Sequence, residues 1–377
     1  MTGRIGRRRC RARPLFRSPP TCLTCHGESC QAALPKEAFL DGKGNILLNR
    51  RMRSVLAAAT LTAALGLVPV GTSQAAACQW QKTAWELPPT TNLGTLYASD
   101  GGRYGVGVTG TRSSTWPYGY KEKQATLWDN GKVVLRLPSI TPVDVNAAGL
   151  IAGNDLLDGT FKGVTVTRTG ASAVLPFDPS WDHSTADAIN DAGDIAGTAA
   201  VGSKQILVVW PASAPGTYRE LAVPDTGSLT ATDIDEQGRI VGYTDTEGFV
   251  TDTSGQWHTL AAQGPNGMGT PWAIRDGRAV GSMDNDTSYA AAEWNDQGSL
   301  VRTIKNGAIS AKAIGGAGTV GGLGFVNSTP RAVLWRNGVV ADPLSGVSDY
   351  FTLTAISTDE KTLIGSDAST PAQYNCV

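Results

Sequence analysis

One short phrase recurs along residues 78–377 and constrains the fold more than any other feature. Its clearest copies, Ala186–Gly197 and Ala231–Gly242, both read Ala-x-x-Ile-(Asn/Asp)-x-x-Gly-x-Ile-x-Gly. Weaker copies close at five further glycines: Gly107, Gly153, Gly281, Gly321 and Gly365. Neighbouring closing glycines stand 39 to 46 residues apart. A period in the low forties, with room for four short strands in each unit, is typical of β-propeller blades.

Each copy of the phrase predicts a β-hairpin. Alternating Ala and Ile residues suit one strand, Asn-x-x-Gly or Asp-x-x-Gly suits the turn, and the β-branched run that follows suits a second strand. Asn and Asp tolerate the left-handed backbone of such turns, and Gly adopts positive φ at no cost. The acids and amides of these turns could also hold calcium, but no complete ligand loop with a downstream bidentate Glu follows them. We therefore interpret these residues as turn formers.

A second phrase follows the hairpin in several units. It consists of an apolar strand that ends in Trp, a turn, and a strand that ends in Leu or Ile, as in Ala125–Gly131 before Leu135. The Trp residues of this phrase are Trp128, Trp210, Trp294 and Trp335. Because they recur at one place in the repeat, we expect them to pack between blades and not to bind a ligand.

The last unit lacks the second phrase, which appears instead at the start of the repeat region as Gln79–Pro88. We therefore predict an all-β, seven-bladed β-propeller of four-stranded antiparallel blades, whose N-terminal strands complete the last blade and close the ring. Closure removes the free sheet edges. Cys78 and Cys376 are the only cysteines after residue 77 and would lie on neighbouring strands of that blade. A disulfide between them suits an oxidising exterior. In this prediction residues 78–377 form one domain of seven repeats of about 43 residues.

The hairpin phrase, followed by Ala-x-Leu-Trp-x-x-Gly, resembles the probable extracellular repeats of the HAF family. The resemblance covers essentially all of residues 78–377. The His-Ala-Phe step that names the family is absent, and Gln124-Ala-Thr, Gly248-Phe-Val and Arg331-Ala-Val stand near its place. The resemblance implies an exported repeat protein of propeller type. It implies no reaction, because the family is recognised by its repeat and not by an active site.

The segment before the repeats has the features of an export signal. Met52-Arg-Ser begins it, the apolar stretch Val55–Val70 follows, and Gly71–Ala77 ends in the small residues of an Ala-x-Ala cleavage site. We therefore expect residues 52–77 to be a signal peptide and residues 1–51 to be an upstream extension from a misassigned start.

Two other interpretations of this segment are less favourable. Cys22-x-x-Cys25, together with His26 and Cys30, lacks the second regularly spaced ligand pair of a zinc knuckle. Lipid attachment at Cys78 is disfavoured because lipid-anchored precursors usually have Leu three residues earlier, where this chain has Ala.

Charge divides sharply at the predicted cleavage site. Residues 1–77 carry 12 basic and 3 acidic side chains, which leaves 20 basic and 30 acidic side chains in residues 78–377, of 32 and 33 in the whole chain. A domain this acidic repels phosphate backbones, so we predict no nucleic-acid partner. No apolar run after the signal reaches the length of a membrane helix, so we also predict no transmembrane segment.

The sequence contains no recognisable catalytic, cofactor or metal motif. Gly-x-Ser-x-Gly, His-Glu-x-x-His and the Gly-x-x-x-x-Gly-Lys-Ser phosphate loop are all absent. His183 and His258 are the only histidines after residue 77, and they stand in different repeats. We therefore assign no catalytic residue and predict no cofactor and no metal site.

Carboxylates drawn from several blades remain a route to catalysis. Glycosidases and lyases on propellers take acids from different blades, so sequence spacing says little about them. The acids in predicted loops are Asp155, Asp158, Asp182, Asp284 and Asp286. Loop aspartates are usually solvated turn formers, so a carbohydrate-active hydrolase or lyase is the alternative function and not the preferred one.

The predicted strand order places the long, irregular connections on one face of the ring. They join the second strand of a blade to the third, and the fourth to the first strand of the next blade. Their aromatic and imidazole side chains are Trp116, Tyr118, Tyr120, Trp181, His183 and Trp272. Propellers carry binding on such loops, and Trp and Tyr suit both sugars and protein partners. We therefore predict a secreted, monomeric, non-enzymatic protein that binds an extracellular glycan or protein through this face; the other interpretation is that these rings pack only their own loops.

Overall fold

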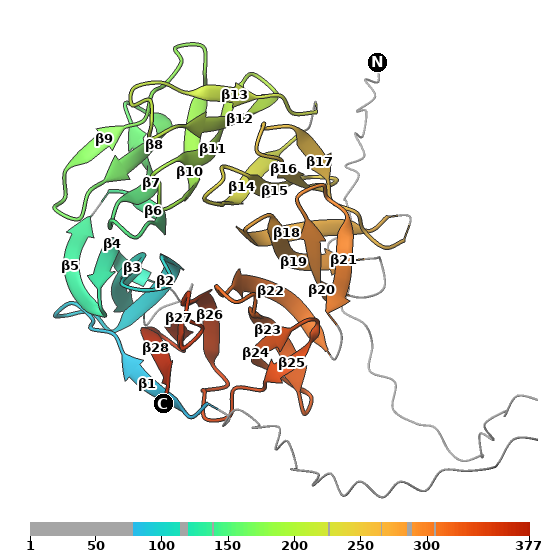
Figure 1. Cartoon of the computed structure of the whole chain (residues 1–377). Coiled ribbons are helices and arrows are strands. Elements are labelled where there is room, and N and C mark those ends of the chain that lie inside the picture. Colours follow the sequence, from blue (N-terminus) through green and yellow to red (C-terminus); the bar gives the residue numbers. More distant parts are fainter. Residues whose placement is uncertain are drawn as a thin grey trace, which may run out of the picture. The chain divides into compact units, whose positions relative to one another are not determined.

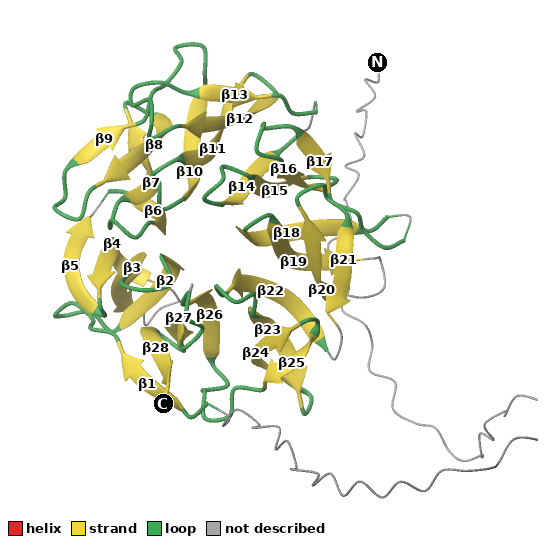
Figure 2. Cartoon of the chain, viewed as in Figure 1, coloured by secondary structure: helices red, strands yellow, loops and turns green. Residues whose placement is uncertain are grey.

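The computed structural model describes residues 78–377, apart from residues 114–119, 138, 225–226, 265, 285–288 and 305–306. The predicted extension 1–51 and the predicted signal peptide 52–77 lie outside the described residues. The described part consists of strands and loops (Figure 2). It contains no helix, and therefore no helical segment long and apolar enough to cross a membrane.

The strands form seven four-stranded antiparallel sheets, which are the blades of a propeller. Blade 1 contains β2 (Leu93–Ser99), β3 (Tyr104–Arg112), β4 (Tyr120–Asp129) and β5 (Lys132–Leu137). Blade 2 contains β6 (Thr141–Val145), β7 (Ile151–Leu157), β8 (Thr160–Val166) and β9 (Ser172–Val174). Blade 3 contains β10 (His183–Ile189), β11 (Ile195–Val201), β12 (Lys204–Trp210) and β13 (Arg219–Leu221). Blade 4 contains β14 (Leu229–Ile234), β15 (Ile240–Thr244), β16 (Gly248–Thr251) and β17 (Trp257–Thr259).

The remaining blades follow the same order, with one exception at the closure. Blade 5 contains β18 (Met268–Arg275), β19 (Arg278–Asp284), β20 (Tyr289–Asn295) and β21 (Leu300–Ile304). Blade 6 contains β22 (Ala308–Ile314), β23 (Val320–Val326), β24 (Thr329–Arg336) and β25 (Val339–Asp342). Blade 7 contains β26 (Phe351–Ile356), β27 (Thr362–Asp367), β28 (Thr370–Cys376) and, from the other end of the repeat region, β1 (Trp80–Ala84).

Blade 7 confirms the predicted closure of the ring. Strand β1 pairs antiparallel with β28, with Trp80 opposite Cys376, and the two strands lie side by side in Figure 1. Cys78 and Cys376 form a disulfide across a sequence separation of 298 residues. The fold class, the blade number and the disulfide that the repeats predicted are therefore all present.

The Trp residues of the second phrase fill the spaces between blades, as predicted. Trp128, Trp294 and Trp335 are among the largest fully buried side chains of the described residues. The Trp128 indole N–H donates to the Glu86 carbonyl oxygen at 2.7 Å, and the Trp294 indole donates to the carbonyl of Ala261 at 2.7 Å. Each of these two rings therefore fixes the connection that leads into its own blade.

The first strand of each blade lines the centre of the ring (Figure 1), and each carries a β-bulge at the same place. At this place the pairing with the second strand skips one residue, so the bulged residue has no partner. The bulged residues are Tyr97, Val143, Asp187, Thr232, Trp272, Lys312 and Thr354. A bulge breaks the alternation of a strand and re-aims the side chain of the extra residue.

The bulge explains why each repeat closes on a glycine. Gly197 pairs with Ala186, next to the bulge of blade 3, and a Cβ at Gly197 would collide with the carbonyl oxygen of Thr185. In blade 6 the residue at this place is Gly322, which pairs with Ala311; the closing glycine assigned from the sequence, Gly321, was wrong by one residue. Two glycines stand next to each other there, and only the strand pairing decides which one faces the bulge.

Candidate functional site

A cavity of about 810 Å³ occupies the centre of the ring, within the size range of small-molecule sites, roughly 300 to 1,000 Å³. It is lined by the seven first strands and by the turns that follow several of them. All seven bulged residues line it. We call these seven residues the bulge ring.

The bulge ring is chemically diverse, whereas the two residues that follow each bulge in sequence are of one type in most blades. The residue after the bulge is Ala in five blades, and the next residue is Ile in five blades. The bulge ring itself contains two aromatic residues, one acid, one lysine, two threonines and one valine. Repeated packing requires repeated residue types, so this diversity at cavity-facing positions is what recognition of an asymmetric ligand requires.

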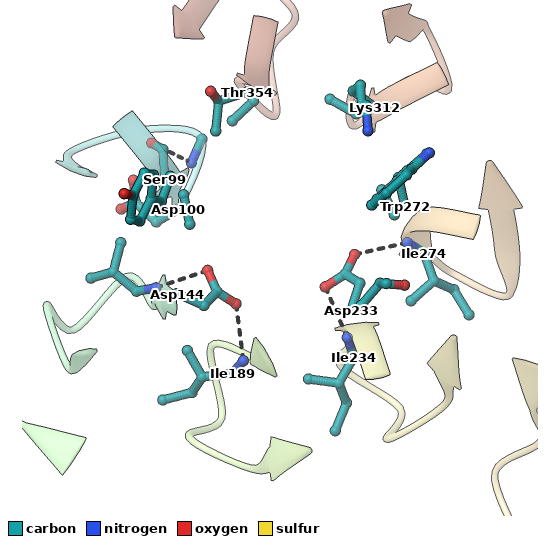
Figure 3. Close-up of a pocket in the computed structure, with 18 of the residues that line it drawn as sticks. Ser99, Asp100, Asp144, Ile189, Asp233, Ile234, Trp272, Ile274, Lys312 and Thr354 are labelled. Atoms are coloured by element: carbon teal, nitrogen blue, oxygen red, sulfur yellow. Dashed lines mark hydrogen bonds between the residues drawn. The ribbon is translucent and has the colours of Figure 1, made fainter. Parts of the chain in front are cut away.

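Two of the cavity carboxylates connect neighbouring blades. The Asp144 carboxylate accepts the N–H of Val145 at 2.8 Å in its own blade and the N–H of Ile189 at 2.9 Å in blade 3. Asp233 does the same between blades 4 and 5, and accepts the N–H groups of Ile234 and Ile274, both at 2.8 Å (Figure 3). Both oxygens of each carboxylate are therefore occupied by the backbone.

Burial also changes the protonation of these acids. Desolvation raises the pKa of Asp144 to about 6, against the two backbone N–H bonds that lower it. Desolvation raises the pKa of Asp233 to about 8, and the nearby Asp144 carboxylate adds to that rise. Burial in a site away from water disfavours the charged form of a carboxyl group, so the cavity tolerates negative charge poorly.

Asp187 is the acid of the bulge ring. Desolvation raises its pKa to about 7, while hydrogen bonds from Thr185 and from the backbone of Ala231 lower it. Asp187 therefore also connects two blades, because Thr185 lies in β10 and Ala231 lies in β14. It differs from Asp144 and Asp233 because it is itself a bulged residue, with a pKa close to neutral pH, so it is the acid of the bulge ring that can exchange a proton near neutral pH.

Lys312 and Trp272 form the opposite chemical pole of the bulge ring. The Lys312 Nζ lies 3.2 Å from the centroid of the Trp272 ring. The indole is held in place, because its N–H donates to Ser282 Oγ at 3.3 Å and Ser282 donates to Ser310 Oγ at 2.9 Å. Burial lowers the pKa of Lys312 to about 8. Within the described part of the chain, no carboxylate forms an ion pair with Lys312.

The cavity is therefore polarised across the ring. The acids of the first strands, Asp144, Asp187 and Asp233, belong to blades 2, 3 and 4, whereas Lys312 belongs to blade 6. The turns after the first strands add further charged residues to the lining: Asp100, Asp191, Asp235, Glu236 and Asp276; Arg275, at the end of β18, also lines the cavity. Figure 3 shows Trp272 between Asp233 and Lys312, with Asp144 on the far side of the opening. A bound molecule would meet carboxyl groups on one side and an ammonium group over an aromatic face on the other.

The residues predicted from the long connections are placed differently. Trp116 and Tyr118 lie outside the described residues, and of Tyr120 only the backbone at the start of β4 is described. Trp181 is buried, with 4% of its surface exposed, and its ring lies 4.7 Å from that of Tyr218. His183 begins β10 and is partly buried. Trp181 therefore packs its own surroundings.

Trp272 is the one predicted residue, among those with described side chains, that lines the cavity. It lies within strand β18 and not in the loop before it, because β18 already begins at Met268. The prediction that the candidate acids lie in loops is wrong for Asp155 and Asp284, which belong to strands β7 and β19. Neither of these two lines the cavity, nor does Asp158 or Asp182, and Asp286 lies outside the described residues. The acids that line the cavity come from the first strands, where Asp144, Asp187 and Asp233 follow or form the bulge, and from the turns after those strands.

The acids and amides of the hairpin turns bond to the backbone of the next blade. The Asn146 amide donates to the carbonyl of Asn190 at 3.2 Å, and the Asn190 amide donates to the carbonyl of Asp235 at 3.0 Å. Asp235 also pairs with Arg239 at 2.8 Å. No group of three or more potential ligands among the described residues is placed to hold a metal ion. These contacts support the interpretation of the turn residues as structural.

Replacing Asp187 with Asn is expected to stabilise the fold above about pH 6. The folded-state pKa of Asp187, about 7, lies above its unfolded value of 3.8, so the wild-type protein loses stability as pH rises from about 4 to about 7. Asn stays neutral, so the variant should gain roughly 1–3 kcal/mol over this window, after a discount for contact with solvent, and no more above it. Urea unfolding at pH 5, 7 and 8.5 measures the difference.

Asp158→Asn is the matched control for this experiment. Asp158 is exposed, lies outside the cavity and adopts a φ of 52°, a conformation that Asn tolerates. This variant should unfold close to wild type in all three buffers. Parallel stability curves for wild type and Asp187→Asn would contradict the assignment of Asp187 as a desolvated acid.

Comparison with known proteins identifies the fold and no family. No protein-family model matches the chain, and no curated protein matches it. Among solved structures, oligogalacturonate lyase in complex with manganese aligns with a TM-score of 0.51 at 9% identity, over 80% of this chain and 97% of that chain.

Two further solved structures are similar at lower TM-scores. Virginiamycin B lyase from Staphylococcus aureus aligns with a TM-score of 0.47 at 14% identity, over 79% of this chain and 99% of that chain. TolB from Acinetobacter baumannii aligns with a TM-score of 0.43 at 12% identity, over 74% of this chain, and the match spans 64% of the TolB chain. At such identities the likeness concerns the fold alone.

Proposed function

We propose that this chain is a non-enzymatic binding propeller that holds a small saccharide in the central cavity through the bulge ring. The observation that carries the proposal is the diversity of the seven bulged residues beside uniform neighbours. The cavity is large enough for a ligand of this size.

The side chains of the bulge ring suit a saccharide. Thr232 and Thr354 provide hydroxyl groups that both donate and accept hydrogen bonds. Tyr97, of which 40% is exposed, provides an aromatic ring for the apolar face of a sugar. Asp187 suits an amino or hydroxyl group, and Lys312 suits an acidic group.

The location that fits this function is extracellular. The disulfide between Cys78 and Cys376 supports an oxidising environment, and the predicted signal peptide 52–77 supports export. The resemblance to HAF repeats implies an exported repeat protein, and we propose that it acts as a monomer. In this proposal the long connections with Trp116, Tyr118, Tyr120 and His183 form a second surface, for a protein partner or a longer glycan.

The second candidate function is a carbohydrate-active lyase or hydrolase. It is favoured by the presence of an acid with a raised pKa, Asp187, and an amine with a lowered pKa, Lys312, in one cavity. It is weakened by Asp144 and Asp233, because both oxygens of each carboxylate already accept backbone N–H groups. Hydrolysis of a glycoside usually requires a pair of free carboxylates, and neither Asp144 nor Asp233 is free in this sense.

Calorimetric titration with neutral, amino and acidic mono- and disaccharides tests the proposal. At least one class should bind wild type, Asp187→Asn should weaken amino sugars, and Lys312→Met should weaken acidic sugars. Each loss should be roughly 10- to 100-fold, because a hydrogen bond to a charged group contributes about 1.5–3 kcal/mol.

Controls outside the cavity separate the site from the general surface. Asp158→Asn and Lys132→Met change exposed residues and should leave binding unchanged. The proposal fails if no saccharide of the panel binds, or if both cavity variants bind as wild type does. Release of a new reducing or unsaturated end during the titration would favour the second candidate.

A further inference from the structure

Lys312 is unusual among the described lysines. Lys82 pairs with Asp367 at 2.6 Å, and Lys121, Lys132 and Lys204 are exposed to solvent. Lys312 and Lys162 are both partly buried, and each lies over an aromatic ring, Trp272 at 3.2 Å and Phe177 at 4.6 Å, but of these two only Lys312 lines the cavity. Burial disfavours the charged form of an amine, so the desolvated Lys312 side chain offers the cavity a neutral amine in part of the molecules.

We propose that Lys312 captures reducing saccharides and other small hydroxyaldehydes covalently, as a reversible imine. This inference rests on the proposed binding cavity and names the reactive group within it. The Trp272 indole, fixed through Ser282 and Ser310, acts as a positioning residue because it holds the Lys312 side chain at the cavity wall.

The step is balanced without any additional reagent. The free amine of Lys312 attacks the aldehyde carbon, a C–N bond forms, and one proton passes through solvent from the nitrogen to the carbonyl oxygen to give a carbinolamine. The carbinolamine hydroxyl then takes up a proton and leaves as water, and the nitrogen gives its remaining proton back to solvent as the C=N bond forms. Nothing is oxidised or reduced, and water reverses the reaction. The threonines of the bulge ring suit the hydroxyl groups that such aldehydes carry.

The environment of Lys312 increases the population of the reactive form. With a pKa of about 8, its amine is free in about one molecule in five at pH 7.4. A lysine with an ordinary pKa of about 10.4 is free in about one molecule in a thousand. Lys312 should therefore react far faster than exposed lysines near neutral pH, and the difference should shrink at higher pH.

Reductive trapping tests this inference directly. The full chain is incubated with glycolaldehyde and cyanoborohydride between pH 6 and 9.5, and the modification of every lysine is measured by mass spectrometry of peptides. Lys312 should be labelled at least tenfold faster than Lys132 and Lys204 at pH 7.4. Its rate should level off above about pH 8, as its amine becomes fully deprotonated.

Two variants and one comparison make the outcome decisive. Lys312→Arg keeps a cation over the indole and should remove the site that is labelled fast. Lys132→Arg should leave the fast labelling of Lys312 unchanged. Labelling of Lys312 no faster than Lys132 would overturn covalent capture. If the saccharide titration still shows binding in that case, the proposed binding function stands alone; if both experiments fail, the cavity is not a saccharide site.

Discussion

Replacing Cys78 and Cys376 together with Ser is expected to lower the free energy of unfolding by roughly 3–5 kcal/mol. The disulfide joins residues separated by 298 positions, so the unfolded chain loses much of its freedom when it is cross-linked. This separation is close to the whole length of the propeller. The cross-link therefore restricts nearly the entire unfolded domain.

The same disulfide fastens the strand that closes the ring. Strand β1 has five residues and pairs only with β28. Its other attachments are few: Trp80 donates from its indole to Asp342 at 3.0 Å, and Lys82 pairs with Asp367. Without the cross-link, β1 should detach from β28 before the rest of the domain unfolds, and the edge of β28 should become exposed.

Urea unfolding with and without a reducing agent measures this effect. Reduced wild type should match the double Ser variant, and oxidised wild type should unfold at a higher urea concentration than either. Hydrogen exchange should show the largest loss of protection in β1 and in residues 370–376. Equal urea midpoints for all three samples would contradict the view that the disulfide stabilises the ring.

The repeats were sufficient to predict the architecture. Six of the seven closing glycines mark the same place in a blade, and Gly321 misses it by one residue, so a period of 39 to 46 residues predicts the blade number directly. The displaced second phrase at Gln79–Pro88 predicted the closure, and the position of Cys78 and Cys376 then predicted the disulfide. The blade number and the ring closure could be predicted because the same pattern occurs several times in the sequence.

The candidate site depends on the β-bulge, which breaks the alternation of each first strand, and it was not predicted. Simple alternation along a first strand gives no reason for Asp187 or Lys312 to enter the centre of the ring. The bulge shifts the register by one residue and changes that expectation. Trp272 was assigned to a loop for a related reason, because the strand that contains it begins earlier than its glycines suggested.

A signal for the site was nevertheless present in the alignment of the repeats. The position two residues before the recurring Ile contains Asp187, Thr232, Trp272, Lys312 and Thr354, while its neighbours are mostly Ala. In the proposed function, divergence at a position whose neighbours are mostly Ala is the sequence signal of ligand recognition. The closing glycine is the second half of that signal, since it stands opposite the bulge in every blade.

Replacing Gly197 with Ala is therefore expected to destabilise the protein by roughly 3–5 kcal/mol, which is more than we expect from the same replacement at an exposed glycine. The added Cβ would collide with the Thr185 carbonyl oxygen, which is backbone and cannot rotate away. Gly102→Ala is the matched control, because Gly102 is exposed and the nearest atom to an added Cβ there is 3.8 Å away. It should be close to neutral or slightly stabilising.

The reason for the large effect at Gly197 lies in the bulge that it permits. The bulge of blade 3 brings the Thr185 carbonyl against the second strand and leaves Asp187 unpaired at the cavity. A Cβ at Gly197 can be accommodated only if the strands separate or the bulge is lost, and either change moves Asp187. Urea unfolding of both glycine variants measures the cost, and saccharide titration of any folded Gly197→Ala protein measures the consequence. Loss of stability in Gly197→Ala with unchanged saccharide binding would show that Gly197 serves packing alone. Loss of both stability and binding would show that Gly197 also positions Asp187 at the cavity.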